Sequence, residues 1–110
     1  MLIYKVFRDP EYQEFVAAGR TAGAPVDLAD GYIHLSTKDQ LPGTLAKHFA
    51  SEDNLHLVAI ESAGMEELRW ETSRDNQKFP HLYRDLIRAD TAWARNIRLV
   101  DGKHETGELD

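Results

Sequence analysis

Residues 55–61, LHLVAIE, constrain the fold more than any other part of this chain. Four apolar side chains follow one another at residues 57–60. Because successive side chains of a strand point to opposite faces, this run is apolar on both faces. Such a strand needs cover on each side, as interior strands of a sheet have. The sequence therefore predicts a sheet with residues 55–61 at its centre.

Four other segments have the β-branched, aromatic or alternating composition that is typical of strands. They are residues 2–7, 32–36, 68–71 and 92–99. Residues 79–83, FPHLY, contain a proline, which cannot donate a hydrogen bond to a neighbouring strand. We expect this segment to be an edge strand or an irregular extended piece, joined to residues 68–71 by a polar loop or hairpin.

Two helices are predicted between these strands. Asp9 is expected to cap the first, and Gly19 to end it in the left-handed conformation. The second begins near Thr37, whose hydroxyl and the Gln40 side chain have the spacing of a capping box. Residues 20–31 are punctuated by glycine and proline without periodicity, which predicts a loop.

The order of elements predicts an α+β fold with one or more small mixed or antiparallel sheets and two main helices. A length of 110 residues, 42% of them hydrophobic, suits one folded domain. We expect residues 1–100 to form that domain and residues 101–110 to be a polar C-terminal tail. No apolar run approaches the roughly 18 residues of a membrane span, so a cytoplasmic protein without membrane contact is expected.

Composition also restricts the chemistry. The chain has no cysteine, which excludes a disulfide frame and a thiolate nucleophile. Neither a histidine cluster with metal-ligand spacing nor a phosphate-binding glycine motif occurs, so no metal site is expected. The net charge of -6 disfavours an extended nucleic-acid surface, because such surfaces need many lysines and arginines. A pocket for a small anion remains compatible with this charge.

Polar side chains occur in pairs, two residues apart, in three of the extended segments. The pairs are His34 with Ser36, Arg69 with Glu71, and His81 with Tyr83. Side chains at this spacing share one face of a strand. If the three pairs meet, they provide the groups that bind a ribose or a phosphate and move protons.

Each pair also has an ordinary structural explanation, which stays open. A strand histidine such as His34 can be a hydrogen-bonded part of the core. Arg69 and Glu71 can form an exposed ion pair that contributes little to stability. Tyr83 can be a half-buried strand aromatic. His48, His56 and His104 are assigned to no site.

The stretches GYIHLSTKDQ, LRWE and FPHLY follow an opening IYKV, and in this order they resemble a bacterial family of unknown function. It is domain-of-unknown-function family nine hundred fifty-two, and the resemblance runs over residues 3–99. That family is remotely similar to the ADP-ribosyltransferase fold, whose members hold NAD in a cleft between two small sheets. The resemblance implies such a fold and a glutamate in the last strand, but residues 91–100 contain none. Glu71 lies earlier in the chain.

The residues and the resemblance together predict an enzyme that is ADP-ribosyltransferase-like or cleaves a glycosidic bond. It would bind NAD as a substrate, or another nucleotide-like or sugar-phosphate-like ligand, and no further cofactor is predicted. The expected catalytic residues are His34, Glu71 and His81, and the expected ligand-binding residues are Ser36, Arg69 and Tyr83. The alternatives are a non-catalytic module that binds a small ligand and a structural protein that acts as a homodimer.

Overall fold

The computed structural model describes residues 1–109, without the side chain of Arg74. Its strands are β1 (Leu2–Arg8), β2 (Arg20–Thr21), β3 (Ile33–His34), β4 (Leu55–Glu61), β5 (Leu68–Thr72), β6 (Lys78–Leu82), β7 (Leu86–Ile87), β8 (Thr91–Val100) and β9 (Lys103–Glu105). Its helices are α1 (Asp9–Ala18), α2 (Pro25–Asp30) and α3 (Leu41–His48), with short 3₁₀ helices at Arg74–Asn76 and Arg88–Asp90. The fold class is α+β, as predicted.

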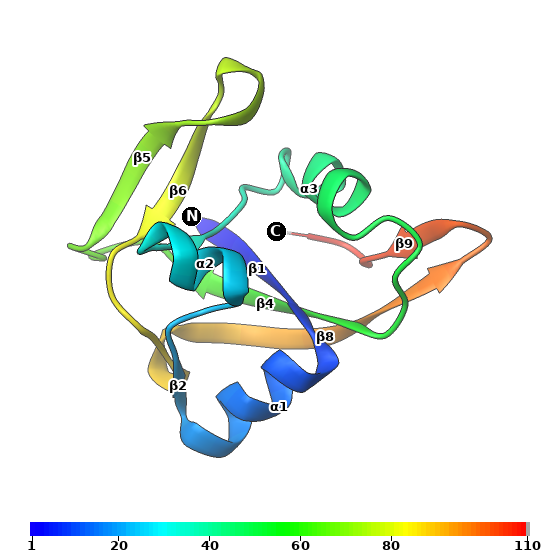
Figure 1. Ribbon diagram of the computed structural model, residues 1–110, viewed down its shortest axis with the longest axis horizontal. Helices are drawn as coiled ribbons and strands as arrows, with labels where there is room; N and C mark the ends of the chain where they lie inside the picture. The colour runs from blue at the N-terminus through cyan, green and yellow to red at the C-terminus, as the bar shows by residue number, and fades with distance from the viewer. Residues whose placement is uncertain (110) are drawn as a thin grey trace.

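The larger sheet is antiparallel and has the strand order β1-β4-β8-β9 (Figure 1). The prediction that residues 55–61 are central is confirmed, because β4 pairs with β1 on one side and with β8 on the other. Helices α1 and α3 lie on opposite sides of this sheet (Figure 1). Phe15 of α1 packs with Ile3 and Phe7, whereas Leu45 of α3 packs with Val6.

A second antiparallel sheet has the order β3-β6-β5, and its β5–β6 hairpin projects from the body of the molecule (Figure 1). The prediction of an edge or irregular piece for residues 79–83 is wrong, since β6 is the middle strand. Pro80 is tolerated there because its carbonyl oxygen accepts from the N–H of Leu35, so its missing N–H also faces Leu35 and not β5. The ladder between β5 and β6 therefore loses no hydrogen bond at Pro80.

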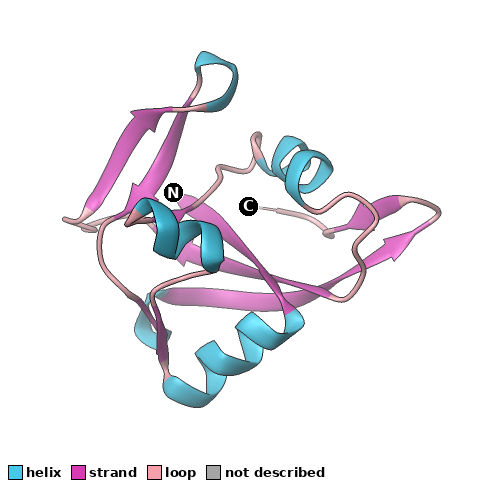
Figure 2. Cartoon of the chain, in the orientation of Figure 1, coloured by secondary structure: helices cyan, strands magenta, loops and turns pink. Residues whose placement is uncertain are grey.

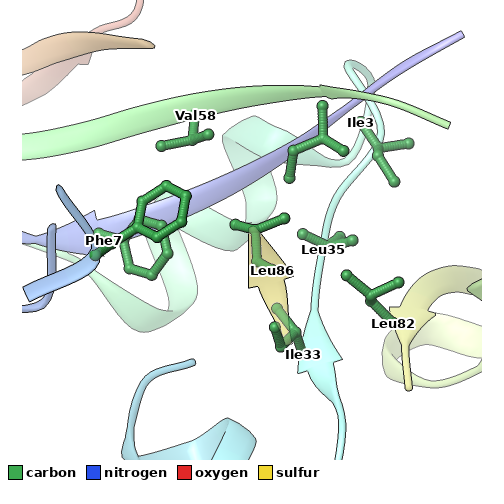
Figure 3. Close-up of a cluster of buried hydrophobic side chains, with 9 residues drawn as sticks. Ile3, Phe7, Ile33, Leu35, Val58, Leu82 and Leu86 are labelled. Carbon is green, nitrogen blue, oxygen red and sulfur yellow. The ribbon is translucent and has the colours of Figure 1, made fainter. Parts of the chain in front are cut away.

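The two sheets meet at a single bridge between Tyr4 of β1 and Ser36, just after β3. Beyond this bridge the strands diverge. The apolar faces of these two sheets pack together in one core, with side chains from β1 and β4 facing those from β3 and β6 (Figure 3). Leu86 of β7, which pairs with β2 in a separate two-stranded sheet, completes this core. The side chains labelled there are Ile3, Phe7, Ile33, Leu35, Val58, Leu82 and Leu86.

Two local predictions for the first helix have different outcomes. Gly19 ends α1 with φ 78°, in the left-handed conformation that was predicted. The residue before the helix is Arg8 rather than Asp9, and its N–H donates to the side chain of Glu11. Asp9 lies inside the first turn instead, where its carboxylate contacts the ring of His56 at 2.8 Å.

The prediction of a loop at residues 20–31 is wrong, because this segment contains β2 and the helix α2 (Figure 2). Pro25 supplies the first residue of α2, where a missing N–H costs nothing. Gly31 ends the helix with φ 85°. The structure therefore has three α-helices among its described residues, rather than two main ones. Asp27, in the first turn of α2, is buried.

The second predicted helix and the tail also differ in detail. Thr37 and Gln40 make both bonds of the predicted capping box, but α3 itself begins at Leu41. Within the predicted tail, β9 pairs with β8 and the His104 ring lies 2.8 Å from the carbonyl oxygen of Glu52. Asp110 lies outside the described residues. No helix within residues 1–109 is long and apolar enough to span a membrane.

Candidate functional site

The register of the second sheet brings the two site histidines together. His34 of β3 lies directly opposite His81 of β6, and their ring centroids are 5.4 Å apart. Arg69 of β5 lies opposite His81 on its other side. The ring of Tyr32 stacks on His81 with a centroid distance of 4.2 Å. Side chains from three strands therefore gather on one face of the sheet.

His34 is held by a buried carboxylate that the sequence did not reveal. The Nδ1 atom of His34 lies 2.6 Å from Oδ1 of Asp27, and its backbone N–H donates to the same oxygen. The ammonium group of Lys5 donates to Oδ2 of Asp27 at 2.6 Å and to the carbonyl oxygen of His34 at 3.2 Å. The side chains of Lys5 and Asp27 are only 6% and 0% exposed. A buried ion pair thus fixes the position of His34.

The charge state of Asp27 follows from these contacts. Burial by itself raises the pKa of Asp27, since it disfavours the charged form. The hydrogen bond from His34 and the charge of Lys5 outweigh this effect, and the pKa ends below its usual value. Asp27 is therefore a carboxylate at neutral pH.

The other ring nitrogen of His34 also faces a carboxylate. Its Nε2 atom lies 3.0 Å from Oδ2 of Asp30, at the end of α2. The His34 ring therefore lies between two carboxylates, and its side-chain hydrogen bond is made to Asp27.

His81 has a carboxylate partner of its own. Its Nδ1 atom lies 2.8 Å from Oε1 of Glu71, and the hydroxyl of Tyr83 donates to the same oxygen at 2.7 Å. The hydrogen bonds from Tyr83 and His81 lower the pKa of Glu71. The same bond raises the pKa of Tyr83 to about 12. A donating Nδ1–H leaves Nε2 of a neutral His81 ring with its lone pair.

A cavity of about 590 Å³ opens beside the two histidines. Its wall is contributed by β1, α2, the residues around β3, α3 and the β5–β6 hairpin. The polar and charged residues that line it are Lys5, Arg8, Asp30, His34, Ser36, Thr44, Lys47, His48, Ser73 and His81. Tyr4, Val6, Leu35, Phe49 and Phe79 are among its apolar and aromatic residues.

The predicted site residues divide into two groups around this cavity. His34, Ser36 and His81 line it, and the Ser36 hydroxyl lies 2.8 Å from that of Thr44. Arg69, Glu71 and Tyr83 are absent from its wall. Tyr83 is 40% exposed, with the Arg69 guanidinium carbon 5.6 Å from the centre of its ring. The second group therefore lies behind His81, and Glu71 reaches the cavity only through that ring.

Reasoning from the sequence missed Asp27 and Lys5, although both left a signal. Lys5 lies on the same face of the first strand as Ile3 and Phe7, which are both buried. A lysine on this face points toward the core and requires a buried partner. Asp27 follows Pro25 at the spacing of a first helical turn, with Gly31 at the helix end. These signals predict a short helix that carries a buried acid.

Among residues 1–109, apart from the Arg74 side chain, no group of three or more histidine, aspartate or glutamate side chains is arranged to hold a metal ion. The groups available for chemistry are thus two carboxylate-bound imidazoles, hydroxyls and basic side chains. They can orient a ligand, bind an anion and transfer protons.

A family model described as "Protein of unknown function (DUF952)" matches residues 6–94. The chain belongs to this family. A crystal structure of protein CC0527 from Caulobacter crescentus is 42% identical, with a TM-score of 0.90 over 96% of this chain and 94% of that one. The solution NMR structure of CC0527 is 40% identical, with a TM-score of 0.85 over 96% and 91% of the two chains.

These relatives are structural genomics targets whose names state no activity. No curated protein matches the chain. The family named in the analysis of the sequence is confirmed, and similarity to ADP-ribosyltransferases is not shown by these comparisons.

Proposed function

We propose that this protein binds a small anionic, nucleotide-like ligand in the cavity and that His34 and His81 act on it. The observation that carries the proposal is that two imidazoles, each held at Nδ1 by a carboxylate, line one cavity 5.4 Å apart. A histidine that serves only the core needs no such pairing. Carboxylates that orient imidazoles are typical of proton-transfer sites.

The shape and charge of the cavity support this class of ligand. Its volume lies in the range of roughly 300–1,000 Å³ that is common for small-molecule sites. Lys47 contributes positive charge to the wall, whereas the Arg8 guanidinium there is paired with Glu52, and Asp30 is the one carboxylate among its described residues. Phe49 and the other apolar residues suit a planar ring, and the hydroxyls of Ser36 and Thr44 suit a sugar.

The roles of the predicted residues follow from these positions. In this proposal His34 is the proton donor, and His81, whose Nδ1 is held by Glu71, is the base. Glu71 acts through His81 and is a positioning residue in this proposal. NAD is one candidate substrate, through an ADP-ribosyltransferase-like reaction or the cleavage of a glycosidic bond. Arg69 and Tyr83 stay predicted ligand contacts for any part of a ligand that extends beyond the cavity.

Isothermal titration calorimetry tests the binding step with ribose 5-phosphate, AMP, ADP-ribose and NAD. We expect at least one of them to bind and His81→Ala to weaken it by about tenfold or more, as loss of a hydrogen bond to a charged group does. His104→Ala is the matched control, because His104 lies outside the cavity wall. Failure of all four compounds to bind the wild type refutes the proposal.

Chromatography of the products then separates an enzyme from a binding module. If NAD is cleaved, nicotinamide accumulates with the wild type and falls by about 10²-fold or more in His34→Gln, which lacks the proton donor. Glu71→Gln should alter the pH profile of the rate, because it acts on the base. Binding of all ligands without any product supports the alternative of a non-catalytic module.

A further inference from the structure

The cavity runs past the open edge of β1. Tyr4 exchanges both of its backbone hydrogen bonds with Ser36, so the N–H and C=O of Tyr4 point away from β4. In an antiparallel ladder every second residue points to the same side. The N–H and C=O of Val6 therefore also point away from β4, toward the cavity that Val6 lines.

No strand of the described residues forms hydrogen bonds with the outward-facing N–H and C=O of Val6. Continuing the Tyr4–Ser36 register by two residues would set His34 opposite Val6, but β3 pairs with β6 at this point. The backbone N–H of His34 donates to Asp27 instead, and its carbonyl oxygen accepts from Lys5. The buried ion pair thus takes up the backbone groups of His34 that could otherwise pair with Val6. Among the described residues, no hydrogen bond to Val6 N–H or C=O completes the other side.

The free edge is one residue long. The next N–H with this orientation belongs to Arg8, and it donates to Glu11. An added peptide strand pairs with several successive edge residues, which this edge does not offer. One N–H and one C=O side by side match a single planar group that carries an acceptor next to a donor.

We propose that Val6 binds such a group, the hydrogen-bonding edge of a nucleobase or a carboxamide, as part of the ligand in the cavity. This inference rests on the proposed function and names the recognition element of the same site. Val6 and His34 each lie two residues from the Tyr4–Ser36 bridge, roughly 7 Å along their strands. Both residues line the cavity, so one nucleoside-sized ligand in it can contact both. The side chains of Leu35 and Phe49 provide apolar wall for its ring.

The test compares ligands with and without the planar group by calorimetry. Ribose 5-phosphate lacks it, AMP carries a nucleobase, nicotinamide mononucleotide carries a carboxamide, and nicotinic acid mononucleotide has a carboxylate in place of the carboxamide. We expect AMP or nicotinamide mononucleotide to bind at least tenfold more tightly than ribose 5-phosphate. A preference for nicotinamide over nicotinic acid mononucleotide identifies a carboxamide, and a gain for AMP alone identifies a nucleobase.

Val6→Pro removes the cavity-facing N–H and no ladder hydrogen bond. We expect this variant to lose the tenfold higher affinity for AMP or nicotinamide mononucleotide. Its affinity for ribose 5-phosphate should equal that of the wild type. Leu2→Pro is the matched control, since Leu2 has the same orientation on β1 but lies outside the cavity wall. If Val6→Pro does not fold, the wild type still decides: its Val6 amide resonance in a ¹H–¹⁵N NMR spectrum should shift with AMP or nicotinamide mononucleotide and not with ribose 5-phosphate.

The two proposals fail in different ways. If ribose 5-phosphate and all the nucleotides bind equally, Val6 recognises nothing and only this inference is overturned. An unshifted Val6 amide with a tightly bound nucleotide overturns it as well. If none of the compounds binds, the proposed function is wrong and this inference falls with it.

Discussion

The buried pair of Lys5 and Asp27 allows a sharp prediction about stability. Asp27→Asn keeps the shape of the side chain but leaves the Lys5 ammonium group buried without a countercharge. Removing one partner of a buried ion pair costs about 3–5 kcal/mol in the free energy of unfolding. Against the roughly 5–15 kcal/mol that stabilises a domain, this is a large loss.

The contacts also predict an order between the two single variants. In Lys5→Met, Asp27 still accepts hydrogen bonds from the N–H groups of Ala24 and His34 and from the His34 ring. In Asp27→Asn, the Lys5 ammonium keeps the carbonyl oxygen of His34 and a neutral amide. Asp27→Asn should therefore cost more than Lys5→Met. The double variant should cost less than the sum of the two, because no uncompensated charge remains.

Urea unfolding of the four proteins at pH 7, followed by circular dichroism, measures these values. Arg20→Met is the control, since Arg20 pairs with Asp85 at the surface, where such a pair contributes about 0–1 kcal/mol. The reasoning is refuted if Asp27→Asn unfolds within about 1 kcal/mol of the wild type, or if the two single effects simply add.

Three further predictions concern the same region. Gly23→Ala should lower the free energy of unfolding more than Gly31→Ala does. Both glycines have positive φ, but a Cβ at Gly23 would clash with Oδ2 of Asp27, whereas a Cβ at Gly31 meets nothing within 4 Å. Equal urea midpoints for the two variants would contradict this. The pKa values of Asp27 and Glu71 are lowered in the folded state. These carboxylates therefore stabilise the fold fully at a pH above their pKa in the unfolded chain, about 4, and this stabilisation is lost as the pH falls through their pKa in the folded protein. A urea midpoint that does not change below about pH 4 would contradict this. Ultraviolet titration of the wild type against Tyr83→Phe should give Tyr83 a pKa of about 12, because of its bond to Glu71; Glu71→Gln should bring it back toward 10, and a value near 10 in the wild type itself would refute the bond.

Local patterns predicted the parts of this fold that depend on neighbours in the chain. The central position of residues 55–61 followed from two apolar faces, and the end of α1 at Gly19 followed from the backbone freedom of glycine. The edge assignment of residues 79–83 failed, because the side that the missing N–H of Pro80 faces depends on the register of three strands. Likewise, α2 was missed because its six residues are too few to show a helical period.

The sequence by itself determined which side chains share a face, since alternation along a strand is a covalent property of the extended backbone. It therefore placed His34 with Ser36 and His81 with Tyr83. Only the tertiary structure decided that His34 lies opposite His81, that Asp27 is buried against Lys5, and that the edge of β1 is open at Val6. These features depend on strand register and on the packing of α2, which contacts between distant residues select by burying apolar surface and pairing buried charge.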